Sequence, residues 1–129
     1  MVKTIRCLLG VAILMTMMLT ASSSSGADEK TYEGEISDSQ CAFGVHSLHR
    51  SHDEMIAMGH AGNTPEECTR FCVNKRGGRY VLETKHDVFK LDNQEMAEKY
   101  AGQRVKLVGT LDSKANTIQV KEIEPLPVK

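Results

Sequence analysis

The sequence predicts a mainly β domain that is interrupted once by a helical insert. Five short segments have the alternating apolar pattern or the β-rich composition that is typical of strands, and turn-forming residues separate most of them. Between the first and second segments, apolar residues recur at helical spacing, and most histidines and cysteines are found there. The predicted strands are Thr31–Ser37, Arg79–Thr84, Val88–Leu91, Arg104–Leu111 and Thr117–Glu124.

The N-terminus has the three parts of a secretory signal peptide. Lys3 and Arg6 form the basic region, and Cys7–Leu19 is a nearly unbroken apolar run. Small residues follow, with Ser25 and Ala27 at the −3 and −1 positions of a cleavage site. The apolar run is shorter than the roughly 20 residues that span a bilayer, which disfavours the alternative of an uncleaved membrane anchor.

Cleavage after Ala27 divides the chain into a signal peptide at 1–27 and a single mature domain at 28–129. Loss of two basic residues with the signal leaves fourteen basic and seventeen acidic side chains, a net charge of −3. This balance gives no electrostatic reason to bind nucleic acid or anionic lipid, so we expect no nucleic-acid partner and no membrane attachment after cleavage. The expected location is exported, periplasmic or extracellular, where thiols tend to oxidise.

A short helix is predicted at Gln94–Ala101, after the third strand. Asn93 is its N-cap and Gly102 its stop, and an apolar stripe packs one face on the sheet. Strand, insert, strand, strand, helix, strand, strand is the order of an OB-fold with an insert, although other small mixed folds share it. We therefore expect an OB-like five-stranded barrel, with helices inserted between strands 1 and 2 and a short helix between strands 3 and 4. The stripe comprises Met96, Ala97, Tyr100 and Ala101.

The Cys/His-rich helical insert, residues 41–76, holds three of the four cysteines and four of the five histidines. A capping motif at Thr64 begins a helix that places Cys68 and Cys72 one turn apart, so that both thiols face the same neighbour. A disulfide within this pair is awkward, because side chains of one helix run parallel. The predicted disulfide joins one of them to Cys41, and closing a loop of ~30 residues would stabilise the fold by roughly 3 kcal/mol.

A metal site would explain the odd number of mature cysteines. His46 follows Cys41 by five residues, and three thiolates with one imidazole form a recognised tetrahedral zinc set. Met55 and Met58 are near in sequence, so soft ligands that favour Cu(I) are the alternative, although the spacing lacks the paired C-x2-C signature. The candidate metal ligands for Zn or Cu are Cys41, His46, Cys68 and Cys72.

The remaining histidines point less clearly to chemistry. The segment Val45–Gly59 has helical periodicity, with His52 in the middle of its apolar face, so we expect His52 to be a core histidine. His49 is expected to be solvated, and His60 and His86 are assigned no role. Three interpretations of the insert stay open: a structural disulfide with a spare buried thiol, a Cys/His metal site, and a reactive or redox-active thiol.

No catalytic motif is found elsewhere. There is no phosphate-binding loop, no Ser nucleophile elbow and no carboxylate pair that differs from ordinary surface charge. We therefore expect an exported binding or structural domain rather than an enzyme, with the insert acting as a disulfide or metal clasp. The alternative is a thiol-redox or metal-binding protein, and the sequence does not indicate a ligand or partner.

Four segments of the mature chain form a recognisable pattern: Gly34–Cys41, Cys68–Val73, Tyr80–Leu82 and Gly102–Val120. Together they resemble a family of small exported bacterial proteins of unknown function, DUF5818. Members of that family often carry glycine after the first cysteine, where this chain has Ala42. The resemblance implies an OB-like exported domain and assigns no catalytic roles.

Overall fold

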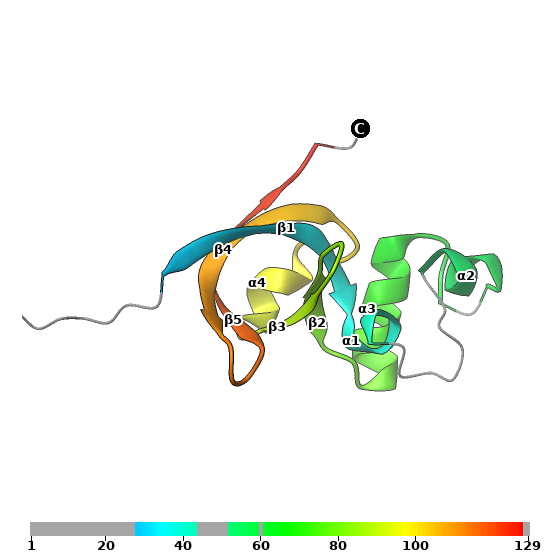
Figure 1. The fold of residues 1–129 in the computed structure, drawn as a ribbon. Helices are drawn as coiled ribbons and strands as arrows, with labels where there is room; N and C mark the ends of the chain where they lie inside the picture. The colour runs from blue at the N-terminus through cyan, green and yellow to red at the C-terminus, as the bar shows by residue number, and fades with distance from the viewer. Residues whose placement is uncertain (1–27, 44–51, 60, 128–129) are drawn as a thin grey trace, which may run out of the picture.

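The computed structural model describes residues 28–43, 52–59 and 61–127 (Figure 1). The predicted signal peptide lies outside the described residues. The architecture is mainly β, with one five-stranded sheet and helices, as the sequence predicts. The strands are β1 (Glu29–Asp38), β2 (Tyr80–Glu83), β3 (Val88–Leu91), β4 (Arg104–Asp112) and β5 (Thr117–Pro125).

The described helices fall into two groups (Figure 1). The short helix α4 (Gln94–Glu98) lies between β3 and β4 in the chain, and the other helices form the insert between β1 and β2. Within the described part of the chain, no helix has the length and apolar character that crossing a membrane requires. The helices of the insert are α1 (Ser39–Ala42), α2 (His52–Ala57) and α3 (Pro65–Arg76).

The strands lie in the order β1-β2-β3-β5-β4, and β4 also pairs with β1, so the sheet closes on itself. All neighbours are antiparallel except β3 and β5, which are parallel. Gly34 lies close to the point where β1 passes from its β4 partner to its β2 partner. A Cβ on Gly34 would lie 3.0 Å from the carbonyl carbon of Glu83, so a glycine is needed for this close approach of the strands.

The core lies inside the closed sheet and is aliphatic. Its largest fully buried side chains include Ile36, Leu82 and Leu107, which come from three different strands. The helix α4 and the turn after it add Ala97 and Ala101, both fully buried. Met96 and Tyr100 pack against the same core, so the predicted apolar stripe is confirmed.

Gln94, at the start of α4, fastens this helix to the β2–β3 hairpin. Its side-chain oxygen accepts the N–H of Tyr80 at 2.8 Å, and Nε2 donates to the carbonyl oxygens of Tyr80 and Leu91 at 2.9 and 3.0 Å. The pairing of β2 with β3 begins only at Val81. The Gln94 amide therefore supplies hydrogen-bond partners for the Tyr80 backbone groups, which have none on β3.

Element boundaries agree with the sequence best in the sheet, where β3 has the predicted bounds. The helix α4 ends at Glu98 instead of Ala101, because the chain turns before Gly102, whose φ is 71°. The helix α1 is not expected from the sequence. The described part of the predicted helical segment 45–59 is helical at α2.

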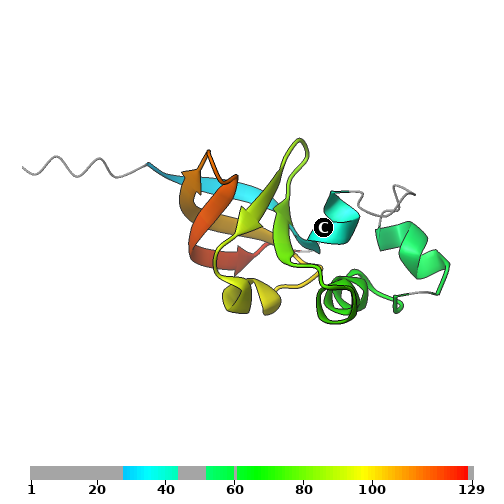
Figure 2. The same cartoon turned by 90° about the horizontal axis from the view of Figure 1, so that it is seen from below.

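The insert packs on the outer side of the sheet, beside β1 and β2 (Figure 2). Because Ile36 and Leu82 point into the core, their neighbours Ser37 and Val81 point outward. Ser37 and Val81 are nevertheless only 0% and 1% exposed, since the insert covers them. The domain therefore has a second buried layer, outside the core, which also contains Cys68, Thr69 and Cys72.

The helix α3 is fastened along its length to the turn after α4, to α4 and to α1. Gly102, in the turn after α4, lies against its first turn. Arg70 donates to the carbonyl oxygen of Glu98 at 3.0 Å, which links α3 to α4. The side-chain amide of Gln40 donates to the carbonyl oxygen of Arg76, which links α1 to the last turn of α3. Of these contacts, the hydrogen bond from Gln40 joins α1 directly to α3.

Candidate metal centre

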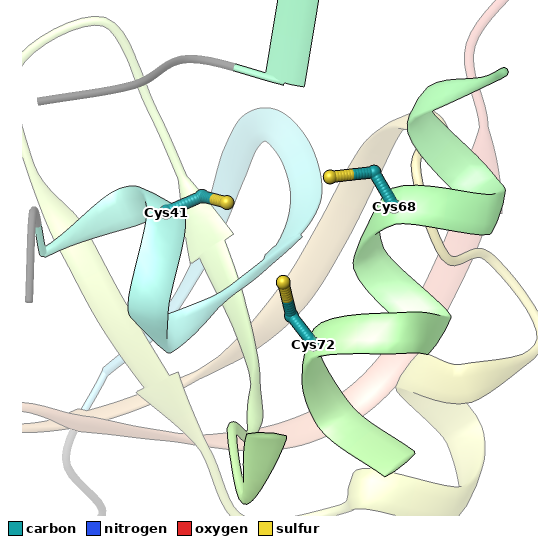
Figure 3. Close-up of side chains that lie close together, drawn as sticks. All are labelled: Cys41, Cys68 and Cys72. Atoms are coloured by element: carbon teal, nitrogen blue, oxygen red, sulfur yellow. The ribbon is translucent and has the colours of Figure 1, made fainter. Parts of the chain in front are cut away.

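Three cysteine side chains converge between α1 and α3 (Figure 3). Cys41 comes from α1, and Cys68 and Cys72 come from successive turns of α3. Their Sγ atoms all lie within 4.8 Å of one another. The predicted grouping of Cys41 with both cysteines of the helix is therefore confirmed.

The start and end of α3 explain why Cys68 and Cys72 project together. Thr64 caps the helix by accepting the N–H of Glu67 at 3.2 Å, and a proline occupies the first turn, as predicted. Gly77 ends the helix in the left-handed conformation, with φ 71°, and its N–H donates to the carbonyl oxygen of Cys72. Both cysteines thus lie on the buried face of a helix that is capped at both ends.

Cys41 is positioned by Asp38, the last residue of β1. One carboxylate oxygen of Asp38 accepts the backbone N–H groups of Gln40 and Cys41, each at 2.9 Å, and so caps α1. Asp38 is fully buried. Ser39 and Arg79 add two hydrogen bonds between α1 and the chain before β2, from Ser39 N–H to the Arg79 carbonyl at 2.8 Å and from Arg79 N–H to the Ser39 hydroxyl at 3.0 Å.

Burial and neighbouring groups raise the pKa of two of the three thiols. Cys68 and Cys72 are 0% and 2% exposed, and Cys41 is half-buried. The pKa of Cys41 is raised strongly, by a hydrogen bond with Cys72, by burial and by the charge of Asp38. Burial, with the charges of Cys72 and Asp38, raises the pKa of Cys68 to about 11. Since the thiolate is the nucleophile, these surroundings disfavour a reactive cysteine.

The predicted disulfide is not formed in this structure. Cys41, Cys68 and Cys72 are all free thiols. Both α3 cysteines face Cys41, so the geometry gathers three sulfur atoms around one point instead of presenting a single pair. The structure therefore shows a cluster of three thiols, and the disulfide stays a prediction.

The predicted imidazole ligand, His46, cannot be placed, and neither can most of the other histidines. His46, His49 and His60 lie outside the described residues, and so does the side chain of His52, whose backbone belongs to α2. His86 is exposed in the turn between β2 and β3. The choice of His46 as a fourth metal ligand therefore stays a prediction.

The donor set fits a thiophilic metal ion. Three cysteine sulfurs can bind as thiolates, and a cation would offset the repulsion among them and with Asp38. Soft thiolate ligands select Cu(I) or Zn²⁺, and structural zinc sites take a fourth ligand to complete a tetrahedron. In the described part of the chain, only these three cysteines form such a group of metal-ligating side chains.

Asp38 is the residue that sequence reasoning missed. The local sequence indicates its role, because aspartate is a preferred N-cap residue and Ser39-Gln40-Cys41 follows it as the start of a helix. The four-residue helix that it begins is too short for the apolar periodicity that identifies longer helices. Capping chemistry, and not periodicity, was the available signal.

Comparison with known proteins gives a family without an assigned function. Residues 72–126 match the family model described as "Protein of unknown function (DUF5818)", which confirms the expected resemblance over that range. The match covers the sheet from β2 to β5 and includes Cys72, but it begins after Cys41 and Cys68. Searches of curated proteins and of solved structures gave no significant match.

Proposed function

We propose that this chain is an exported, non-enzymatic OB-like domain whose insert is held to the sheet by a metal ion on Cys41, Cys68 and Cys72. The observation that carries the proposal is the convergence of the three Sγ atoms within 4.8 Å of one another. Export is supported by the signal-like composition of 1–27, and the OB-like fold by the order of strands and helices.

A metal accounts for all three sulfurs, whereas a disulfide accounts for two. A disulfide between Cys41 and either α3 cysteine would leave the other α3 cysteine as a buried thiol that the disulfide does not explain. The three cysteines also come from elements that are capped and fastened before any metal binds, so the ligands are preorganised. Metal binding here joins the end of β1 to the middle of α3, and its free energy adds to the stability of the folded domain.

Zinc and Cu(I) are the two ions that the ligands favour. Zinc requires a fourth ligand, for which His46 is the sequence-based candidate. Cu(I) is satisfied by sulfur ligands alone, and the half-buried Cys41 leaves the cluster accessible from one side.

Native mass spectrometry of the reduced mature domain, titrated separately with Zn²⁺ and Cu(I), tests the proposal. One ion per chain is expected. The variants Cys41→Ser, Cys68→Ser and Cys72→Ser should each lose it, and His86→Ala is a control that should keep it. The proposal fails if the wild-type domain binds neither ion, or if all three cysteine variants bind as tightly as the wild type.

A disulfide clasp is the second candidate, favoured by the hydrogen bond between Cys41 and Cys72. Under oxidising conditions this pair would bond and leave Cys68 buried and reduced. Alkylation of the protein purified from an oxidising compartment separates the two candidates. The metal clasp gives three alkylated cysteines after denaturation in a chelator, whereas the disulfide clasp gives one until a reductant is added.

A further inference from the structure

A cleft of about 400 Å³ lies next to the insert, at the junction of α1, β2, β3 and the start of β5. Its volume is within the range of roughly 300–1,000 Å³ that is usual for small-molecule sites. Apart from its charged rim, the lining is largely apolar. The lining residues that matter here are Ser39, Phe43, Arg79, Val81, Lys90 and Thr117.

A row of paired residues across the sheet explains why a cleft forms there. Ser37 pairs with Val81, Val81 with Lys90, and Lys90 with Thr117. The first two are buried under the insert, but Lys90 is exposed and Thr117 half-exposed, and both line the cleft. The insert thus covers Ser37 and Val81 but not Lys90 and Thr117. The helix α1, at the border of the covered part, forms one wall of the cleft.

The rim of the cleft carries two cations that have no acid partner. Among the described residues, neither Arg79 nor Lys90 forms an ion pair. One acidic residue, Asp92, also lines the cleft; its carboxylate accepts the N–H of Val120 at 2.8 Å and forms no ion pair with Arg79 or Lys90 among the described residues. Phe43 is 45% exposed, which is unusual for a phenylalanine, and it offers an aromatic face on the wall.

We propose that this cleft binds a small molecule with an aromatic or apolar body and one acidic group. The body would lie against Phe43 and the apolar floor near Val81, and the acidic group would be held by Arg79 and Lys90. Unpaired cations beside an apolar surface favour such a ligand over a neutral one, because charge-assisted hydrogen bonds form where water is partly excluded.

The cleft is also linked to the thiol cluster, an inference that rests on the proposed metal clasp. The helix α1 carries Cys41 on one side, while Ser39 and Phe43 at its two ends line the cleft. Metal binding fixes Cys41 and hence the wall of the cleft. By thermodynamic linkage, a ligand in the cleft then changes the metal affinity by the same factor as the metal changes ligand affinity.

Fluorescence titration of the reduced, metal-free mature domain with 8-anilinonaphthalene-1-sulfonate tests the cleft itself. N-phenyl-1-naphthylamine, which has the same aromatic body without the sulfonate, is the uncharged control probe. We expect saturable binding of the sulfonate, about tenfold tighter than binding of the uncharged probe. The double variant Arg79→Gln/Lys90→Gln should abolish this preference, whereas Lys99→Gln/Lys114→Gln, which removes two exposed cations elsewhere, should keep it.

A second pair of variants tests the apolar wall. Phe43→Ala should weaken binding of both probes by about tenfold, and Met58→Ala, at a residue with the similar exposure of 42%, should not. Circular dichroism of every variant checks that it is folded. Equal affinity for the two probes, or unchanged binding by the Arg79/Lys90 double variant, overturns the proposed cleft.

Repeating the titration with the zinc-loaded domain tests the linkage. The dissociation constant of the sulfonate probe should shift by about fivefold or more, and the shift should vanish in Cys41→Ser. A zinc-loaded domain with an unshifted constant overturns the linkage but leaves the cleft supported. A domain that binds the probe but neither zinc nor Cu(I) overturns the metal clasp alone, so the two proposals fail separately.

Discussion

The carboxylate of Asp38 accepts the backbone N–H of Cys41 at 2.9 Å, and this hydrogen bond ties the end of β1 to the first ligand of the thiol cluster. The same oxygen accepts the N–H of Gln40, so one side chain determines where α1 begins. Because Asp38 is fully buried, no solvent can take over its role. The geometry of the cluster therefore depends on a residue outside it.

Replacing Asp38 with alanine should destabilise the domain by ~1–2 kcal/mol through loss of the cap, and should weaken metal binding because Cys41 is no longer held. Asp38→Asn keeps an acceptor oxygen and should retain more of both properties. Urea unfolding under reducing conditions and metal titration are the measurements. Asp112→Ala is the control: Asp112 makes the equivalent contacts to Lys114 and Ala115 in an exposed turn, so metal affinity should stay unchanged.

The sequence predicted the sheet well because its signals are local. Alternating burial in β4, for instance, places Val105 and Leu107 in the core, and the bounds of β3 follow from the turns on either side. The grouping of Cys41 with Cys68 and Cys72 was also predictable, since one helical turn separates the last two.

The state of the cysteines was not predictable, because it depends on how three side chains share one space. Spacing alone cannot tell a pair of sulfurs from a cluster of three. The cleft was missed for a similar reason: Phe43, Arg79 and Lys90 are far apart in the sequence and meet only through the packing of α1 on the hairpin. Long-range packing of this kind leaves no periodic signal.

Raising the pH should destabilise the metal-free, reduced domain. The pKa of Cys68 is raised in the folded state from 9.0 to about 11, so the folded state holds a proton that the unfolded state releases. The stability linked to this proton is fully present below pH 9 and is lost as the pH rises toward 11. Urea midpoints measured from pH 7.5 to 10.5 should fall, and the fall should be shallower for Cys68→Ala.

Tyr80 complicates the comparison, because burial raises its pKa as well and gives a contribution of the same sign. Tyr80→Phe removes that contribution and should leave the part due to Cys68 and to Cys41, whose pKa is also raised. If the urea midpoint of Cys68→Ala falls with pH as steeply as that of the wild type, folding does not raise the pKa of Cys68.

Gly102 should be intolerant of substitution because it touches the first turn of α3. Its φ is 71°, and an added Cβ would lie 2.7 Å from the Cα of Glu66. Gly102→Ala should destabilise the domain by ~1–3 kcal/mol and weaken metal binding, since α3 must shift. Gly77→Ala is the matched control, with the same φ of 71° but no atom within 4 Å of the added Cβ. If both variants lose the same stability, the loss comes from backbone strain at positive φ, and the contact between Gly102 and α3 contributes nothing.

His46 should matter for one metal and not for the other. If zinc is held in a tetrahedron by the three thiolates and this imidazole, His46→Ala should weaken zinc binding by about tenfold or more. Cu(I) is satisfied by sulfur ligands, so its affinity should be unchanged. His86→Ala, at an exposed turn away from the cluster, should affect neither ion. Competition titrations of the three proteins against a chromophoric chelator measure both affinities. Unchanged zinc binding by His46→Ala would exclude this histidine as the fourth ligand, whereas equal losses for zinc and Cu(I) would indicate that it supports the fold of the insert.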